Sequence, residues 1–139
     1  MLYLRYGNVE IKNRHKYLLQ YHIIFVCKYR KKLLMSKQIS DDIKQFSYEI
    51  CQKHKVIIRY METDKDHIHY MIETEPTMSI SKIVNLMKSY TAYHIWKRYP
   101  DYLRKHFWKE YTFWTDGYFV CSTGNVSEEM LRKYIENQG

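Results

Sequence analysis

The chain has 139 residues, enough for one compact domain and too few for two ordinary ones, so we expect a single domain over residues 1–139. Hydrophobic residues make up 45% of it, which excludes a wholly disordered protein. Lys and Arg outnumber Asp and Glu by 23 to 15, and the net charge of +8 favours an anionic partner, either nucleic acid or an acidic membrane surface.

The N-terminal part of the chain predicts a strand followed by a helix. Residues 1–14 carry few core signals and are expected to form a loosely attached arm. Residues 17–27 are rich in β-branched and aromatic side chains and predict the strand, which the basic run 28–32 follows. The helix is predicted to begin at Ser40, which can cap it, because aspartates and then regularly spaced apolar residues come after it.

The middle of the chain predicts two further strands and a second helix. Residues 56–62 and 67–73 have the composition of strands, and the polar turn 63–66 joins them. Residues 77–99 place apolar side chains along one helical stripe. Pro100 is expected to end this helix.

The C-terminal part completes an α+β pattern. Residues 111–114 and 118–121 are strand-like, and residues 125–138 predict a final helix that Asn125 or Ser127 could cap. The predicted order β-α-β-β-α-β-α indicates a ferredoxin-like antiparallel sheet with two helices on one face. The final helix is the natural cover for the other face.

The cysteines and the hydropathy pattern indicate the cell compartment. The three cysteines are far apart, odd in number and form no C-x-x-C pair, so neither a disulfide framework nor a zinc knuckle is indicated. The N-terminus lacks the apolar stretch of a signal peptide, and no run approaches the ~18 apolar residues of a membrane span. We therefore expect a cytoplasmic protein without a membrane partner.

Aromatic residues narrow the choice of anionic partner. The chain has 15 Tyr, 3 Trp and 5 Phe, and many stand among basic residues, as in 29–32 and 96–99. Because cations neutralise phosphates and flat rings stack on unpaired bases, this mixture favours single-stranded nucleic acid, although core packing is the other interpretation of most rings. The basic run supplies the candidate DNA-backbone contacts, or else forms a solvated loop: Lys28, Arg30, Lys31 and Lys32.

The sharpest local pattern is the H-x-H of His67 and His69 in the third predicted strand. In a strand these side chains point to the same face, with Cβ atoms about 7 Å apart. Two imidazoles on one face can chelate one divalent metal ion. Alone, however, the pattern is more typical of two satisfied or solvated histidines.

The final predicted helix carries further groups of this chemistry. Tyr134 and Gln138 are four residues apart and share a helical face, so Gln138 could give a carbonyl oxygen to the metal beside the phenol. Glu136 would compete as a carboxylate ligand, but it lies two positions from Tyr134 and is expected to face away. The alternative is that Tyr134 only packs the helix on the sheet.

Several segments, spread over roughly residues 17–138, match a known family in their order and spacing. They are Tyr21-His22-Ile23-Ile24-Phe25 with Lys28-Tyr29-Arg30-Lys31, Thr63-Asp64-Lys65-Asp66-His67-Ile68-His69, Phe113-Trp114-Thr115 with Tyr118-Phe119, Ser122-Thr123-Gly124, and Lys133-Tyr134-Ile135-Glu136-Asn137-Gln138. In these segments the chain resembles the single-tyrosine HUH transposases of small bacterial and archaeal insertion sequences with hairpin ends. The H-x-H together with the terminal Tyr-Ile-Glu-Asn-Gln is the specific part of the resemblance.

The resemblance implies an enzyme and its site. His67 and His69 would be the metal ligands, Gln138 would complete the metal site and Tyr134 would be the catalytic nucleophile. The implied cofactor is Mg²⁺ or Mn²⁺. The implied reaction is metal-dependent cleavage and rejoining of single-stranded DNA with hairpin ends through a 5′-phosphotyrosine. The implied assembly is a homodimer in which the tyrosine helix of one subunit can complete the histidine site of the other.

Two other functions are compatible with parts of the sequence. Another HUH nuclease, a replication initiator or relaxase, would use the same cut-and-link chemistry on a different DNA. A non-catalytic ferredoxin-like module could bind single-stranded RNA or DNA through its sheet, but it would need aromatic residues on the face where His67 and His69 are placed. Metal dependence and a covalent adduct would distinguish this module from the nucleases.

Overall fold

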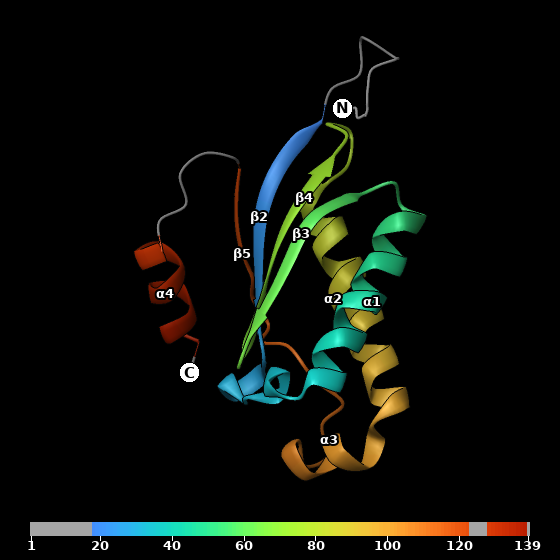
Figure 1. The fold of residues 1–139 in the computed structure, drawn as a ribbon, viewed down its shortest axis with the longest axis vertical. Coiled ribbons are helices and arrows are strands. Elements are labelled where there is room, and N and C mark those ends of the chain that lie inside the picture. Colours follow the sequence, from blue (N-terminus) through green and yellow to red (C-terminus); the bar gives the residue numbers. More distant parts are fainter. Residues whose placement is uncertain (1–17, 123–127, 139) are drawn as a thin grey trace.

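The computed structural model describes residues 18–122 and 128–138 (Figure 1). Within them, a four-stranded antiparallel sheet has helices on both sides, which confirms the predicted α+β class. The expected arm 1–14 and the proposed caps Asn125 and Ser127 lie outside the described residues. No helix of the described ranges is long and apolar enough to cross a membrane.

The strands stand in the order β3-β4-β2-β5, and each neighbouring pair is antiparallel. In chain order the elements are β2 (Leu19–Val26), η1 (Lys28–Arg30), η2 (Leu33–Met35), α1 (Lys37–Lys53), β3 (Ile57–Asp64), β4 (His67–Thr74), α2 (Ile80–Arg98), α3 (Pro100–His106), β5 (Phe119–Ser122) and α4 (Glu128–Glu136).

The two faces of the sheet follow from the alternation of side chains along each strand. In β4, Ile68, Tyr70 and Ile72 are completely buried and belong to the hydrophobic core, whereas His67 and His69 are only partly buried. Helices α1 and α2 lie on the core side of the sheet and α4 lies on the other side (Figure 1). The histidines therefore face the side on which α4 lies.

The start of α1 differs from the prediction. The helix begins at Lys37, and the Ser36 hydroxyl caps it by accepting a hydrogen bond from the Ile39 backbone N–H at 3.2 Å. Ser40 is instead buried, with its hydroxyl 2.6 Å from that of Thr63 on β3. The earlier start adds Ile39 to the buried apolar face of the helix, and this burial decides between two serines that could both cap a helix.

The segment between α2 and β5 also differs from the prediction. Pro100 follows the end of α2 but begins α3, at a helix position where the missing proline N–H has no partner to lose. This short helix buries Leu103 completely. The predicted strand 111–114 forms only an isolated bridge between Trp114 and Cys27.

Candidate active site

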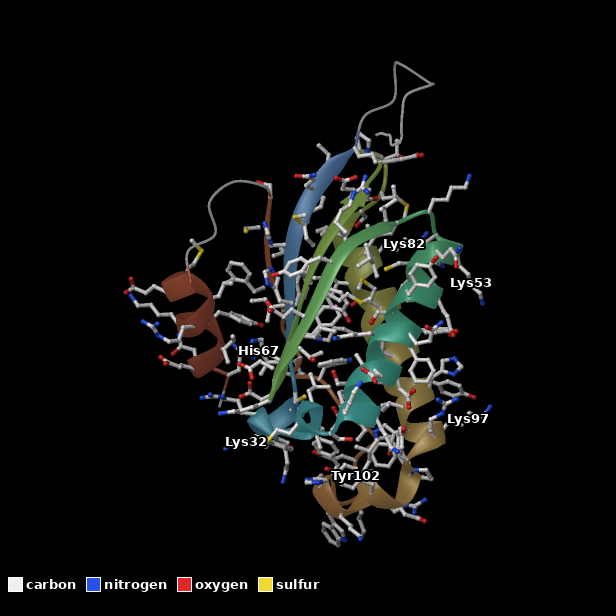
Figure 2. The ribbon with its side chains drawn as sticks, in the orientation of Figure 1. Lys32, Lys53, His67, Lys82, Lys97 and Tyr102 are labelled. Carbon is white, nitrogen blue, oxygen red and sulfur yellow. The ribbon has the colours of Figure 1, made fainter. Side chains whose placement is uncertain are left out.

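An open pocket of about 750 Å³ lies between the sheet and α4. His67 and His69 line it from the sheet, and Leu131, Ile135 and Glu136 line it from the helix. Figure 2 shows His67 on the α4 side of the sheet. The pocket thus brings together the two histidines expected from the sequence and one face of the tyrosine-bearing helix.

The His67 ring is fixed by a carboxylate. Its Nδ1 lies 3.0 Å from Asp66 Oδ1, and Asp66 Oδ2 accepts a hydrogen bond from Arg30 Nε at 3.1 Å. Burial alone would raise the pKa of Asp66, but the hydrogen bonds from His67 and Arg30 outweigh it and lower that pKa. Because an ionised carboxylate only accepts hydrogen bonds, Nδ1 carries the proton and Nε2 presents a lone pair, as in metal-bound histidines.

The His69 ring has a partner on each nitrogen. Its Nδ1 lies 3.1 Å from the hydroxyl of Tyr60, which donates to Glu62 at 3.4 Å. Its Nε2 lies 3.0 Å from Nδ1 of His22. Burial is the main cause that lowers the pKa of His69, and charge on His22 lowers it further. A lowered pKa favours the neutral ring, which is the form that binds metal ions.

His22 was not among the site residues expected from the sequence. It lies on β2, whose register pairs Ile24 with His69, so His22 occupies the same sheet face two residues away. The ring centroids of His22 and His69 are 5.2 Å apart. Alternation within the first predicted strand was the available signal, since it puts His22 opposite the core residues Ile23 and Phe25.

Tyr134 does not line the pocket that holds the histidines. Its ring packs on Phe119 of β5, with centroids 5.5 Å apart. Its phenolic oxygen is buried and makes no hydrogen bond within the described part of the chain. Burial raises the pKa of Tyr134, and the nearby Thr115 hydroxyl opposes that rise. In this position the phenol is a poor nucleophile.

Glu136, the last residue of α4, and Gln138, in the turn that follows it, are placed differently with respect to the pocket. The Gln138 amide donates to the Tyr134 carbonyl at 3.3 Å and does not line the pocket. Glu136 does line it. Glu136 lies on a different side of the helix from Tyr134, as expected. However, Glu136 and not Tyr134 lines the pocket with the histidines, which differs from the expectation that Tyr134 stands beside the metal site. The contact with Phe119 turns the tyrosine side of α4 towards β5.

Lys88 on α2 organises the loop against which Tyr134 packs, and the sequence alone did not single it out. Its ammonium donates to three carbonyl oxygens, of Thr115 at 2.6 Å, Asp116 at 3.0 Å and Gly117 at 3.1 Å. Burial is the main cause that lowers the pKa of Lys88. A Cβ at Gly117 would lie 3.9 Å from the Tyr134 phenolic oxygen, so this loop reaches the tyrosine directly.

The four basic residues expected to contact DNA occupy two places. Arg30 and Lys32 line the pocket, and Figure 2 shows Lys32 towards the same end of the molecule as Tyr102 of α3. Lys28 lies outside the pocket, 3.5 Å from an Asp116 carboxylate oxygen. Lys31 is partly exposed on the same turn. Their contacts with DNA stay a prediction.

The donor groups of the pocket can be compared with the needs of a divalent cation. His67 presents Nε2, the nitrogen that Asp66 leaves open, to an ion that accepts nitrogen ligands, whereas Nε2 of His69 would have to leave His22 to bind the same ion; α4 brings Glu136 to the same pocket. In residues 18–122 and 128–138, no three His, Cys, Asp or Glu side chains converge as a metal centre. The histidine pair therefore fits part of a coordination sphere, which α4 would have to complete.

The chain is similar to known proteins over most of its length. The sequence model of a family described as "Transposase IS200 like" matches residues 15–138. The chain is 27% identical over 122 residues to the ISDra2 transposase TnpA of Deinococcus radiodurans, covering 88% of this chain and 85% of that protein. It is 28% identical over 119 residues to the IS200 transposase of Salmonella typhimurium, covering 86% and 76% respectively.

Solved structures share the fold. A crystal structure described as a transposase of Deinococcus radiodurans superposes with a TM-score of 0.79 at 26% identity, covering 94% of this chain and 98% of the other. A REP-associated tyrosine transposase bound to a REP hairpin superposes with a TM-score of 0.56 at 11% identity, covering 92% and 69%. At that identity the second likeness concerns the fold alone.

Proposed function

The chain belongs to the family of IS200-like transposases, and we propose that it cleaves and rejoins single-stranded DNA through Tyr134. One observation carries the proposal. Two histidines whose ring orientations are fixed by Asp66 and Tyr60 face a pocket whose other wall is the helix that bears Tyr134. A non-catalytic binding module has no need for this arrangement.

The proposed chemistry is a reversible exchange of ester bonds. The Tyr134 oxygen bonds to phosphorus and loses its proton, while the bond from phosphorus to the 3′ oxygen breaks and that oxygen leaves as a hydroxyl. The product is a 5′-phosphotyrosine and a free 3′ end. Because the link keeps the energy of the phosphodiester, a 3′-hydroxyl from another strand can reverse the step without ATP. This property suits strand transfer better than degradation.

We propose that His67 and His69 hold Mg²⁺ or Mn²⁺ and that Gln138 is the third protein ligand. When bound, the cation would supply a Lewis acid that polarises the phosphate. Asp66 keeps the lone pair of His67 on Nε2, the nitrogen that is free of this hydrogen bond. Since Glu136 lines the pocket here and Gln138 does not, α4 has to turn to bring Gln138 in.

We also propose that the active unit is a homodimer on hairpin-ended DNA. The support is that Tyr134 packs on Phe119 and does not line the pocket of its own chain. The test mixes two inactive variants, Tyr134→Phe and His67→Ala. A covalent DNA adduct that returns on mixing supports sites built from two subunits, and a mixture that stays inactive contradicts them.

The cleavage reaction is tested with labelled single-stranded DNA from the hairpin-bearing flanks of the gene. With Mg²⁺ or Mn²⁺, we expect a covalent protein–DNA band on a denaturing gel, and EDTA abolishes it. Addition of a second hairpin end should yield a joined strand, which separates a transposase from a nuclease that only cuts. Tight binding without a band under either metal would support the non-catalytic module instead.

A further inference from the structure

Two large aromatic side chains stand in water on the segment that follows α3. Trp108 is 80% exposed and Tyr111 is 79% exposed, whereas the other two tryptophans of the chain, Trp96 and Trp114, are 8% and 4% exposed. Large aromatic rings contribute strongly to the energetics of interfaces when a partner covers them. The segment therefore offers a surface for a partner to cover.

Two sets of contacts hold this segment in place. The indole of Trp96 donates to the Thr112 carbonyl at 2.8 Å and stands edge-on to the Tyr111 ring, 5.0 Å from it. The Tyr29 hydroxyl donates to both carboxylate oxygens of Glu110, each at 3.0 Å. The exposed rings are thus presented from a fixed backbone, so a partner meets a prearranged surface.

The backbone here adopts conformations that non-glycine residues rarely take. Tyr29, Arg30 and Lys109 have φ angles of 59°, 53° and 59°, and they are three of the four non-glycine residues with positive φ among those described. Such angles are strained and gather at functional sites. Tyr29 itself is 55% exposed and contacts Phe107 and Glu110.

Lysine ammonium groups lie close to the exposed rings, and they indicate the chemistry of the partner. Lys109 Nζ lies 4.7 Å from the centre of the Trp108 ring, and Lys28 Nζ lies 5.6 Å from that of Tyr29. An apolar protein surface would strip water from these ammonium groups without replacing it. A nucleic acid strand supplies a base for each ring and a phosphate for each cation.

The turn η1 joins this surface to the histidine pocket. Tyr29 contacts Glu110 on one side of the turn, and the next residue, Arg30, binds Asp66 and lines the pocket with His67. Helix α3 and η1 lie at the same end of the molecule (Figure 1). A strand that leaves the pocket over this turn meets the exposed rings next.

We propose that Tyr29, Trp108 and Tyr111 form a stacking platform for unpaired bases of the DNA strand whose phosphate enters the histidine pocket. Lys28 and Lys109 neutralise the phosphates between those bases. The inference rests on the proposed function, since it assigns the path of the single-stranded substrate beyond the site of cleavage.

Tryptophan emission tests the platform without labels, because Trp108 is the exposed member of a set of three. The full chain is titrated with an oligothymidylate in EDTA, which prevents cleavage, and binding is followed separately by anisotropy of a labelled copy. We expect emission to fall along the same curve as the anisotropy rises. A duplex of equal length should leave the emission unchanged.

Two matched variants measure how much Trp108 contributes to the affinity for the oligothymidylate. Trp108→Ala should weaken binding of the oligothymidylate by about tenfold, which corresponds to the loss of one base–aromatic stack. Because Trp108 is exposed, the substitution should leave the fold intact. The control is Tyr93→Ala on α2, because Tyr93 is also exposed, at 61%, and also has a lysine, Lys97, at 5.6 Å from its ring. Binding by the control variant should equal that of the wild type.

The outcomes separate the platform from the proposed reaction. Normal binding with unchanged Trp108 emission, or wild-type affinity in Trp108→Ala, would overturn the platform. So would an emission change that follows protein concentration in the absence of DNA, because a second copy would then cover the rings. If quenching occurs as expected but no covalent adduct forms with metal, the proposed reaction fails and the platform stands.

Discussion

Tyr70 and Tyr134 lie on opposite sides of one sheet, and each buries its hydroxyl oxygen in a different way. The Tyr70 hydroxyl is 2.7 Å from the Ser47 hydroxyl, which donates to the Ile43 carbonyl at 2.7 Å. The Tyr134 oxygen has no hydrogen bond within the described ranges. Since buried polar groups are nearly always paired, this phenol departs from the ordinary rule for a group that only stabilises the fold.

The neighbours of the two tyrosines extend this contrast. On the core face, Ile68 and Ile72 flank Tyr70 and all three are completely buried. On the pocket face, His67 and His69 are partly exposed, and their hydrogen bonds orient rings towards the pocket. Substitutions on the core face should therefore change stability, and substitutions around the pocket should change metal binding or cleavage.

Of the four substitutions, Tyr134→Phe should reduce adduct formation the most. Adduct formation should fall by at least about a thousandfold, because phenylalanine has no nucleophilic oxygen. Stability should be unchanged or higher by up to about 1 kcal/mol, because the removed oxygen is buried without a partner. Adduct gels and urea denaturation on the same preparation measure both. A stability loss above about 2 kcal/mol would put Tyr134 with the core instead.

Asp66→Asn should come next in size. An amide can turn its N–H₂ towards His67 and favour the wrong tautomer, so Mn²⁺ affinity should fall by about ten- to a hundredfold. Calorimetric titration with Mn²⁺ in the absence of DNA measures it. Asp64→Asn is the control, because Asp64 lines the same pocket but accepts its hydrogen bond, within the described ranges, from the Lys65 backbone and not from a histidine. Equal losses in both variants would mean that charge alone matters.

Tyr70→Phe should lower stability and leave cleavage intact, the opposite of what is expected for Tyr134→Phe. It removes one buried hydrogen bond and leaves the Ser47 oxygen short of a donor, so stability should fall by about 1 kcal/mol. Adduct formation per folded molecule should not change. Chemical denaturation and the gel assay measure the two quantities. A cleavage defect in fully folded Tyr70→Phe protein would contradict the expectation that the core face affects stability and the pocket face affects metal binding or cleavage.

Glu73→Gln should have the smallest effect, because Glu73 shares the histidine face but lies at the far end of β4. Burial would raise the pKa of Glu73, but hydrogen bonds from Arg59 and Gln20 lower it below its ordinary value of 4.5. The carboxylate therefore stabilises the fold above pH 4.5, by up to about 1 kcal/mol, and this is lost as the pH falls through the lowered pKa.

Denaturation at a series of pH values measures this difference. Wild type and Glu73→Gln should converge in acid, since protonation then removes the charge that the substitution removes. A difference that stayed constant into acid would contradict the stated cause of the pKa shift. Adduct formation should be unaffected at neutral pH, because Glu73 does not line the pocket.

Much of the sheet could be predicted because its signals are local. Predicted strands 56–62 and 67–73 correspond to β3 and β4, since alternation and β-branched composition need only neighbouring residues. The start of α1 could not be predicted, because Ser36 and Ser40 both suit a cap and the burial of Ile39 decides between them. Helix α3 is too short for its periodicity to stand out.

The candidate site also combines features that the local sequence predicts with features that depend on long-range packing. His67 and His69 could be paired from the sequence, because two positions along a strand fix a common face. The contact of His22 with His69 depends on the register between β2 and β4, which joins residues 47 positions apart. The side of α4 that faces the histidines depends on the packing of Tyr134 against Phe119, which helical spacing alone does not contain.

Peptide mapping of the protein–DNA adduct shows whether Tyr134 forms the covalent bond to DNA. The wild-type adduct, formed with Mn²⁺ and trimmed by nuclease, is digested and examined by mass spectrometry for nucleotide mass on each of the 15 tyrosines. We predict the added mass on Tyr134, joined through a 5′-phosphate. Nucleotide mass on another residue, or a 3′ linkage, would contradict the account.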